Sequence, residues 1–140
     1  MLKKDIPKKK KVKNGNLKAD WKRGKNIIKM DLPVMLFKEK KVFIAYIPVL
    51  DISGYGNTET ESLSSLHIVL EEYIDYTIKK NTLVADLKGL GWTISKRSKP
   101  FIAPELTDLI SSNEYLHDIF NKKKYSVQQF PVLLPEPKIA

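Results

Sequence analysis

A stretch from Thr58 to Asn81 has the pattern of one long amphipathic helix, and this helix limits the architectures open to the chain. Thr58 and Glu61 have the spacing of a capping box, and two lysines close the last turn, where positive charge is favourable. A helix with one apolar face must bury that face against another layer of structure. The stripe recurs at steps of three and four residues, at Leu63, Leu66, Leu70, Tyr73 and Thr77.

The residues before this helix are predicted to form the sheet on which it packs. Val34–Phe37 and Val42–Ile47 are rich in β-branched and aromatic residues and flank a charged turn, which predicts a β-hairpin. Ile27–Met30 predicts an earlier strand, and Pro33 is expected to separate it from the hairpin. Gly54–Gly56 predicts a short strand between the hairpin and the helix.

The residues after the helix predict shorter elements. We expect helices over Leu83–Lys88, Glu105–Ile110 and Glu114–Phe120, and strands over Trp92–Ser95 and Tyr125–Leu134, the last at the edge of a sheet. The predicted fold class is α+β, an antiparallel sheet with one long helix. We expect a basic disordered arm over residues 1–25, an α+β domain over 26–95 and a C-terminal extension over 96–140.

The positive charge is concentrated at the start of the chain. Residues 1–30 hold twelve Lys/Arg and two Asp, whereas residues 31–95 have a net charge of −3 and the whole chain +9. Like charges repel and little apolar surface is available here, so this arm is expected to be disordered. Its lysines can bind nucleic-acid phosphates and Trp21 can stack on bases; a solvated tail or a nuclear import signal are the alternatives. The nucleic-acid-binding candidates are Lys8, Lys9, Lys10, Lys11, Lys13, Trp21, Lys22 and Arg23.

Several protein classes are excluded by composition. The chain has no cysteine, which excludes a disulfide scaffold, a thiolate zinc site, an iron–sulfur cluster and a cysteine nucleophile. Its two histidines are too few for a His-rich metal centre, and we expect no cofactor. No apolar run approaches the length of a membrane span, and no apolar segment follows the first lysines. We therefore expect a cytoplasmic protein without a secretory signal.

The acidic and nucleophilic residues of the chain have bland explanations. A Mg²⁺-dependent hydrolase would need clustered carboxylates, but Glu59 and Glu61 are explained by helix capping. Glu71, Glu72 and Asp75 are expected on the solvent face of the helix. His67 borders the apolar stripe and is expected to be partly buried, and serines 62, 64 and 65 are expected on the helix surface. No catalytic partner is identifiable, so we predict that the chain is not an enzyme.

The segment from Ala45 to Leu63 carries a pattern of turns and glycines. An aromatic strand and a proline are followed by an Asp-x-x-Gly turn, Asp51 to Gly54, and then by Gly56-Asn57-Thr58. Glu61 follows near the start of the helix, with Ser62 after it. This order resembles the HicB antitoxins, which have Gly-Asp-Thr and then Glu-Ala at these places. The resemblance covers about residues 34–80.

The resemblance implies a partial ribonuclease-H-like fold without catalytic acids, with helix on one face of the sheet, assembled into homodimers or higher oligomers. It also implies a partner, a small basic HicA-like ribonuclease toxin that the chain neutralises. A mildly acidic centre suits a basic partner. We expect the toxin to contact the acidic helix face and the turn, namely Asp51, Tyr55, Asn57, Glu71, Glu72 and Asp75.

Two features depart from the family pattern. Its members usually carry a C-terminal DNA-binding domain, which the order of elements in residues 96–140 does not match. The basic arm is not part of the pattern either. The alternative function is therefore a nucleic-acid-binding protein that uses the lysine-rich arm for affinity and the folded domain for dimerisation.

Overall fold

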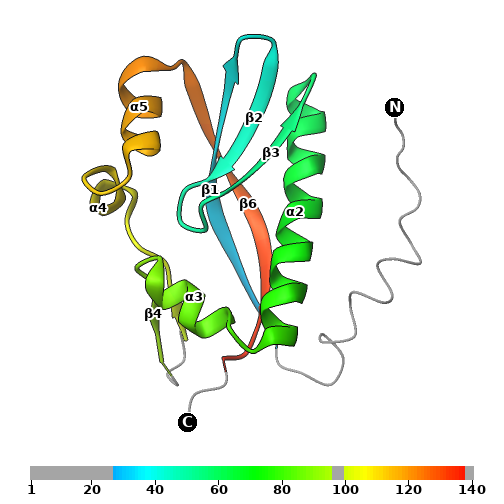
Figure 1. The fold of residues 1–140 in the computed structure, drawn as a ribbon, viewed down its shortest axis with the longest axis vertical. Coiled ribbons are helices and arrows are strands. Elements are labelled where there is room, and N and C mark those ends of the chain that lie inside the picture. Colours follow the sequence, from blue (N-terminus) through cyan, green and yellow to red (C-terminus); the bar gives the residue numbers. More distant parts are fainter. Residues whose placement is uncertain (1–26, 96–99, 138–140) are drawn as a thin grey trace.

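The computed structural model describes residues 27–95 and 100–137, which form an α+β fold. Its main sheet has four antiparallel strands in the order β3-β2-β1-β6, and a small second sheet pairs β4 with β5 (Figure 1). The strands are β1 (Ile27–Glu39), β2 (Val42–Ile47), β3 (Ile52–Gly56), β4 (Thr93–Ile94), β5 (Phe101–Ile102) and β6 (Tyr125–Pro135). The helices are α2 (Glu59–Lys80), α3 (Leu83–Gly89), α4 (Leu106–Ile110) and α5 (Glu114–Lys122).

Strand β1 is longer than the sequence predicts, because it runs through Pro33 without a break. The expected separation at this proline is therefore wrong. Strand β2 pairs with β1 only from Met35 onward, so no residue of β2 pairs with Pro33. Pro33 has no N–H to donate, and on that side none is needed. The hairpin is confirmed, and its turn is shorter than expected because only Lys40 and Lys41 lie outside the strands.

The predicted cap by Thr58 is present at the start of α2, and the reciprocal bond of Glu61 goes to the residue before the cap. The backbone amide of Glu61 donates to Thr58 Oγ1 over 3.0 Å, and the Glu61 carboxylate accepts from the amide of Asn57 over 2.8 Å. These contacts satisfy amides that have no partner within the helix. The helix ends at Asn81, whose left-handed backbone (φ 61°) lets its amide bond back to the last turn.

Helices pack on both faces of the main sheet, whereas the resemblance implied helix on one face only. On one face Leu66 and Leu70 of α2 pack against alternate residues of β1, β2 and β6. On the other face Leu116 and Ile119 of α5 cover Met35 and its neighbours. The second layer forms because α5 has an apolar face of its own, which a sheet left open on one side can bury.

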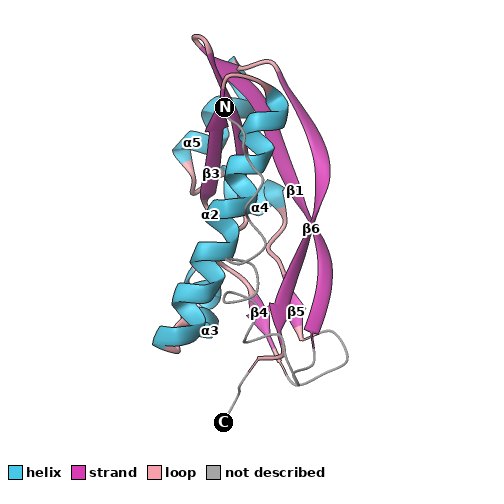
Figure 2. Cartoon of the chain, turned by 90° about the vertical axis from the view of Figure 1, so that its right-hand side faces the viewer, coloured by secondary structure: helices cyan, strands magenta, loops and turns pink. Residues whose placement is uncertain are grey.

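The C-terminal strand completes the main sheet. The prediction of an edge strand is confirmed, and its neighbour is β1, with pairing from Phe37 opposite Tyr125 to Ile27 opposite Pro135. The two strands form a long twisted ribbon along one side of the molecule (Figure 2). Among the described residues, no helix is both long and apolar enough to cross a membrane.

Candidate protein-binding surface

The turn that carries the family resemblance lies where β3 crosses α2. A Cβ added to Gly54 would lie 2.2 Å from the backbone nitrogen of Leu66, and one added to Gly56 would lie 2.4 Å from Glu61 Cβ. Only glycine allows the strand backbone to lie this close to the helix. The same contact buries Ser62, which the sequence placed on the helix surface. That expectation is wrong because a small side chain is needed beneath Gly54.

A backbone amide on the outer edge of β3 finds its hydrogen-bond partner on α2. The amide of Tyr55 donates to Ser65 Oγ over 3.2 Å, across the corner between strand and helix. The Tyr55 side chain itself is 57% exposed. The predicted contact residue Tyr55 is therefore available to a partner.

Asp51 has a structural function in the turn before β3. Its backbone is left-handed (φ 55°), and its carboxylate accepts a hydrogen bond from the Tyr46 hydroxyl over 2.7 Å. The same hydroxyl accepts from Asn113 Nδ2 over 3.0 Å, and Asn113 is also the N-cap of α5. Burial raises the pKa of Tyr46, and the hydrogen bond to Asp51 raises it further. Asp51 therefore links the turn to α5.

A second aromatic side chain borders this surface. Tyr115 of α5 packs edge-on against Tyr46, with ring centroids 5.0 Å apart, and remains 38% exposed. Burial, together with the nearby Glu39 carboxylate and Tyr55, raises its pKa to about 12. Tyr55 and Tyr115 thus present neighbouring aromatic groups to solvent. Tyr115 is not among the contact residues predicted from the sequence, although the spacing of Leu116 and Ile119 places it at the margin of the apolar face of α5.

The acidic face of α2 is less uniform than predicted. Glu72 is exposed and Glu71 is partly buried, but Asp75 is buried, with 9% of its surface exposed. The expectation that Asp75 lies on the solvent face is wrong, and helical periodicity, which puts it opposite the stripe, does not predict its burial. The prediction for His67 also fails, since its side chain is 62% exposed, 3.9 Å from Glu71 and beside the Phe130 ring.

The predicted contact residues do not form one compact cluster. Asn57 precedes the first turn of α2, whereas Glu72 lies about 20 Å further along the helix at 1.5 Å per residue. Asp51 lies at the other end of β3 from Asn57. These residues therefore describe an extended surface, which suits a protein partner better than a small ligand. Within residues 27–95 and 100–137, no group of three His, Asp or Glu side chains could hold a metal ion.

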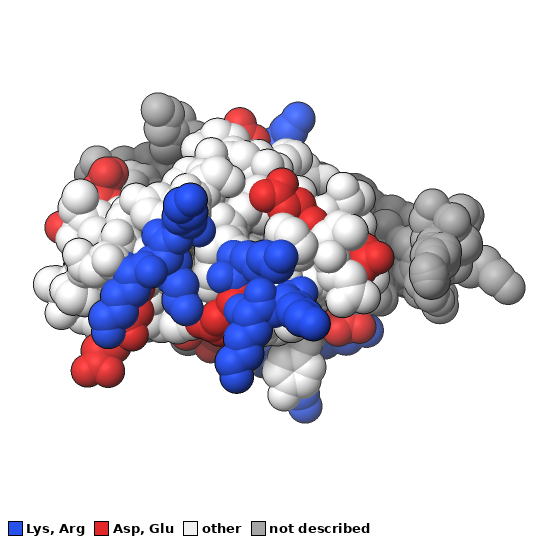
Figure 3. Space-filling view, turned by 90° about the horizontal axis from the view of Figure 1, so that it is seen from above, with Lys and Arg blue, Asp and Glu red and all other residues white. Residues whose placement is uncertain are grey.

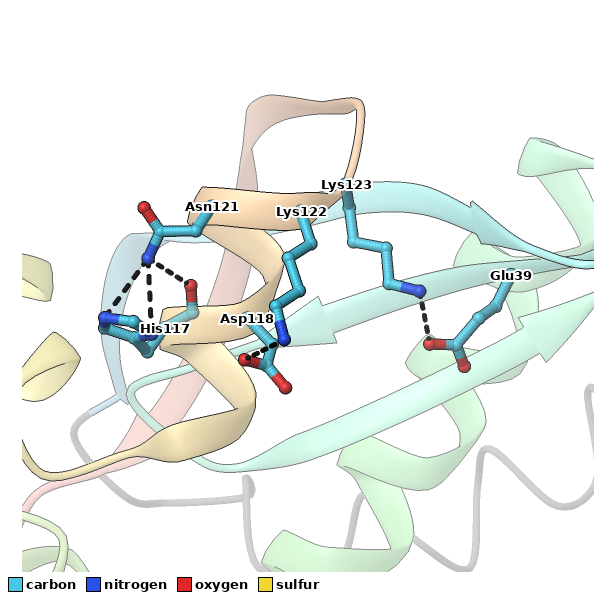
Figure 4. A network of polar contacts seen from close by, with 6 residues as sticks. All are labelled: Glu39, His117, Asp118, Asn121, Lys122 and Lys123. Atoms are coloured by element: carbon cyan, nitrogen blue, oxygen red, sulfur yellow. Dashed lines mark hydrogen bonds and ion pairs between the residues drawn. The ribbon is translucent and has the colours of Figure 1, made fainter.

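Lysines gather at the end of the molecule that holds the β1–β2 turn (Figure 3). Lys40 and Lys41 form that turn, Lys122 ends α5, and Lys123 and Lys124 connect α5 to β6. Lys123 Nζ lies 2.9 Å from Glu39 Oε2 (Figure 4). This ion pair joins the segment after α5 to the last residue of β1, next to the β1–β2 turn. The described residues as a whole contain ten lysines and fourteen acidic residues, a net charge of −4. The folded part is thus acidic with one basic end.

The raised pKa of Tyr73 predicts that the fold loses stability at high pH. Burial and Asp86 raise the pKa of Tyr73 to about 12, from an ordinary value of 10.0. The folded state keeps this proton above pH 10, where the unfolded state loses it, so the free energy of unfolding should fall as the pH rises from 10 to about 12. Urea unfolding across this range measures the slope. Tyr73→Phe should make the slope shallower, with the remainder coming from Tyr46 and Tyr115. Tyr76→Phe, at a 62% exposed position, is the control; equal slopes in all three proteins would contradict the prediction.

The arm residues proposed for nucleic acid, from Lys8 to Arg23, lie outside the described residues. Comparison of the chain with protein-family models, with curated proteins and with solved structures gives no match.

Proposed function

We propose that the chain is an antitoxin that binds and neutralises a small basic, mRNA-cleaving toxin of the HicA-like kind. The observation that carries this proposal is the corner between β3 and α2. Among the glycines in the described part of the chain, Gly54 and Gly56 of the HicB-like pattern are the two at which a Cβ would collide with the helix. The pattern therefore has a physical reason in this chain, together with the capping contacts of Thr58 and Glu61.

The charge of the folded part favours a basic partner. The described residues have a net charge of −4 within a chain whose net charge is +9, so their acidic surface attracts a cationic protein at short range. Tyr55 and Tyr115 add exposed aromatic area of the kind that dominates binding energy at protein interfaces. In this proposal Tyr55, Asn57 and Glu72 contact the toxin, whereas Asp51 holds the turn in place through Tyr46.

RNA cleavage by a purified HicA-like toxin, with and without an equimolar amount of the chain, tests this function. The chain should block cleavage, and Tyr55→Ala and Glu72→Lys should each weaken the inhibition about tenfold or more, as expected at an interface hot spot. Glu105→Lys is the control, because it makes the same charge change at an exposed residue before α4 that makes no capping bond. Undiminished cleavage at equimolar protein would refute the antitoxin proposal.

The basic end favours a second candidate, nucleic-acid binding. In this candidate function Lys40, Lys41 and Lys124 contact phosphates, whereas Lys122 and Lys123 form ion pairs with Asp118 and Glu39. Each lysine on a phosphate should contribute about one unit to the slope of log K against log salt. Lys40→Ala with Lys41→Ala should thus reduce the slope by about two, while the same change at Lys79 and Lys80, which close α2, should leave it unchanged. A slope unaffected by the hairpin change would exclude this end as the contact.

A further inference from the structure

Strand β6 is an edge that the described part of the chain leaves without a second neighbour. The opposite edge, β3, is protected because α2 crosses it and Ser65 takes up the amide of Tyr55. The first five residues of β6, Tyr125–Gln129, are exposed on both faces of the sheet. β6 is therefore the edge open to a further strand.

The prolines of this ladder reveal which backbone groups point outward. Pro33 of β1 faces Gln129, while Pro131 and Pro135 of β6 face Asp31 and Ile27. All three prolines occupy the same alternate set of pairs in the ladder. A proline is accommodated where its nitrogen points away from the partner strand. This set therefore consists of the pairs that do not exchange hydrogen bonds between β1 and β6.

The same alternation applies to the exposed half of β6. Tyr125, Val127 and Gln129 belong to the set that contains Pro131, so their amides and carbonyls point toward the outer edge. No proline interrupts this half, and no residue of β6 is charged. Natural edge strands commonly carry charges that prevent pairing with another chain. The absence of charge here indicates an edge that is used.

We propose that this edge binds a second copy of the chain, β6 against β6 in antiparallel orientation, about a two-fold axis at Val127. This register uses the whole proline-free half, since Tyr125 then pairs with the second copy's Gln129. Ser126 lies opposite the second copy's Gln128, and neither pair brings like charges together. Shifting the centre toward Pro131 would place a residue without an N–H inside the new ladder.

The surface beside the edge fits the same occupant. A groove between α2 and β6 is lined by His67, Glu71, Ile74 and Val132. In the proposed register the second copy's Lys124 lies opposite Phe130, on the face of the sheet that carries α2 and beside His67 and Glu71. The second copy's Lys124 thus meets the acidic side chain of Glu71, which favours a second copy over an unrelated strand.

Single cysteines test the register, because the chain has no cysteine of its own. Val127→Cys should form a disulfide-linked dimer on mild oxidation, since the two Cα atoms of a hydrogen-bonded pair lie about 5.5 Å apart, within disulfide reach. Gln129→Cys should not, because its copies would be about 13 Å apart along the strands. Tyr76→Cys, on the exposed side of α2, measures cross-linking by random collision. Cross-linking of Val127→Cys no faster than that of Tyr76→Cys would overturn the proposal.

The mass in solution is an independent measurement that does not depend on toxin binding. Light scattering over a concentration series should give twice 16.1 kDa for the full chain. Val127→Lys should shift the equilibrium to the monomer, because the axis places the two new charges opposite each other. Leu133→Lys introduces the same charge at a 38% exposed position of the same strand outside the proposed pairing, and should remain dimeric. A monomeric mass for the unchanged chain at every concentration, or dissociation caused equally by both variants, would overturn the proposal.

Discussion

Gly54→Ala is expected to destabilise the fold by about 3 kcal/mol or more, at or beyond the upper end of the usual cost of overpacking. The added Cβ would lie 2.2 Å from Leu66 N and 2.4 Å from Ser62 O. Both are backbone atoms of a long helix, so no side-chain rotation can relieve the collision. Strand β3 would have to move away from α2 and give up the bond from Tyr55 to Ser65. Urea unfolding followed by circular dichroism measures the loss.

Gly89→Ala provides the matched control for this variant. A Cβ at Gly89 meets no atom within 4 Å, and the residue lies in α3, where alanine is favoured by up to about 1 kcal/mol. The control should therefore be neutral or stabilising. If Gly54→Ala unfolds at the same urea concentration as Gly89→Ala, the close contact between β3 and α2 is not present in solution. Because the corner carries the resemblance to HicB antitoxins, that result would also remove the main support for the proposed function.

Trp92→Ala is expected to cost about 3–5 kcal/mol, the range for removing a large aromatic side chain from a core. Trp92 is 4% exposed and packs edge-on against Phe101. Its indole N–H donates to the carbonyl oxygen of Val49 over 2.7 Å. The side chain thus joins the segment after α3 to the turn between β2 and β3, and its loss leaves both a cavity and an unpaired carbonyl.

Trp92→Phe separates these two contributions. Phenylalanine retains most of the apolar contact but cannot donate to Val49, so about 1–3 kcal/mol should be lost. Thermal unfolding of the three proteins, followed by circular dichroism, should therefore rank the original chain above Trp92→Phe and Trp92→Ala last. An identical loss in both variants would show that the hydrogen bond, and not the packing, dominates at this position.

The elements predicted correctly from the sequence are those determined by neighbouring residues. Helix α2, its capping contacts and the β1–β2 hairpin depend on spacings of a few residues, and all are present. The continuity of β1 through Pro33 could not be predicted, because it depends on where β2 stops and on pairing with Gln129 far along the chain. The second helical layer could not be predicted for the same reason, because α5 packs on residues of β1 and β2 that are far away in the sequence.

The candidate surface was predictable only in part. Tyr55 is exposed as a contact residue must be, since alternation along a short strand points it outward. The link from Asp51 through Tyr46 to Asn113 joins residues up to 67 positions apart, and no local pattern contains it. The exposure of His67 and the burial of Asp75 likewise depend on what lies beside the helix, which helical periodicity does not specify.

The antiparallel pairing of β1 with β6 has a consequence for the order of folding. β1 opens the described part of the chain and β6 comes after every other strand, so Ile27 meets Pro135 only when the intervening sequence has been made. During synthesis the hairpin and α2 can associate early, while one edge of β1 stays without a partner. Contacts between such distant residues close slowly. A growing chain therefore exposes Leu32 and Val34, which β6 helps to bury in the finished fold, until its last strand arrives.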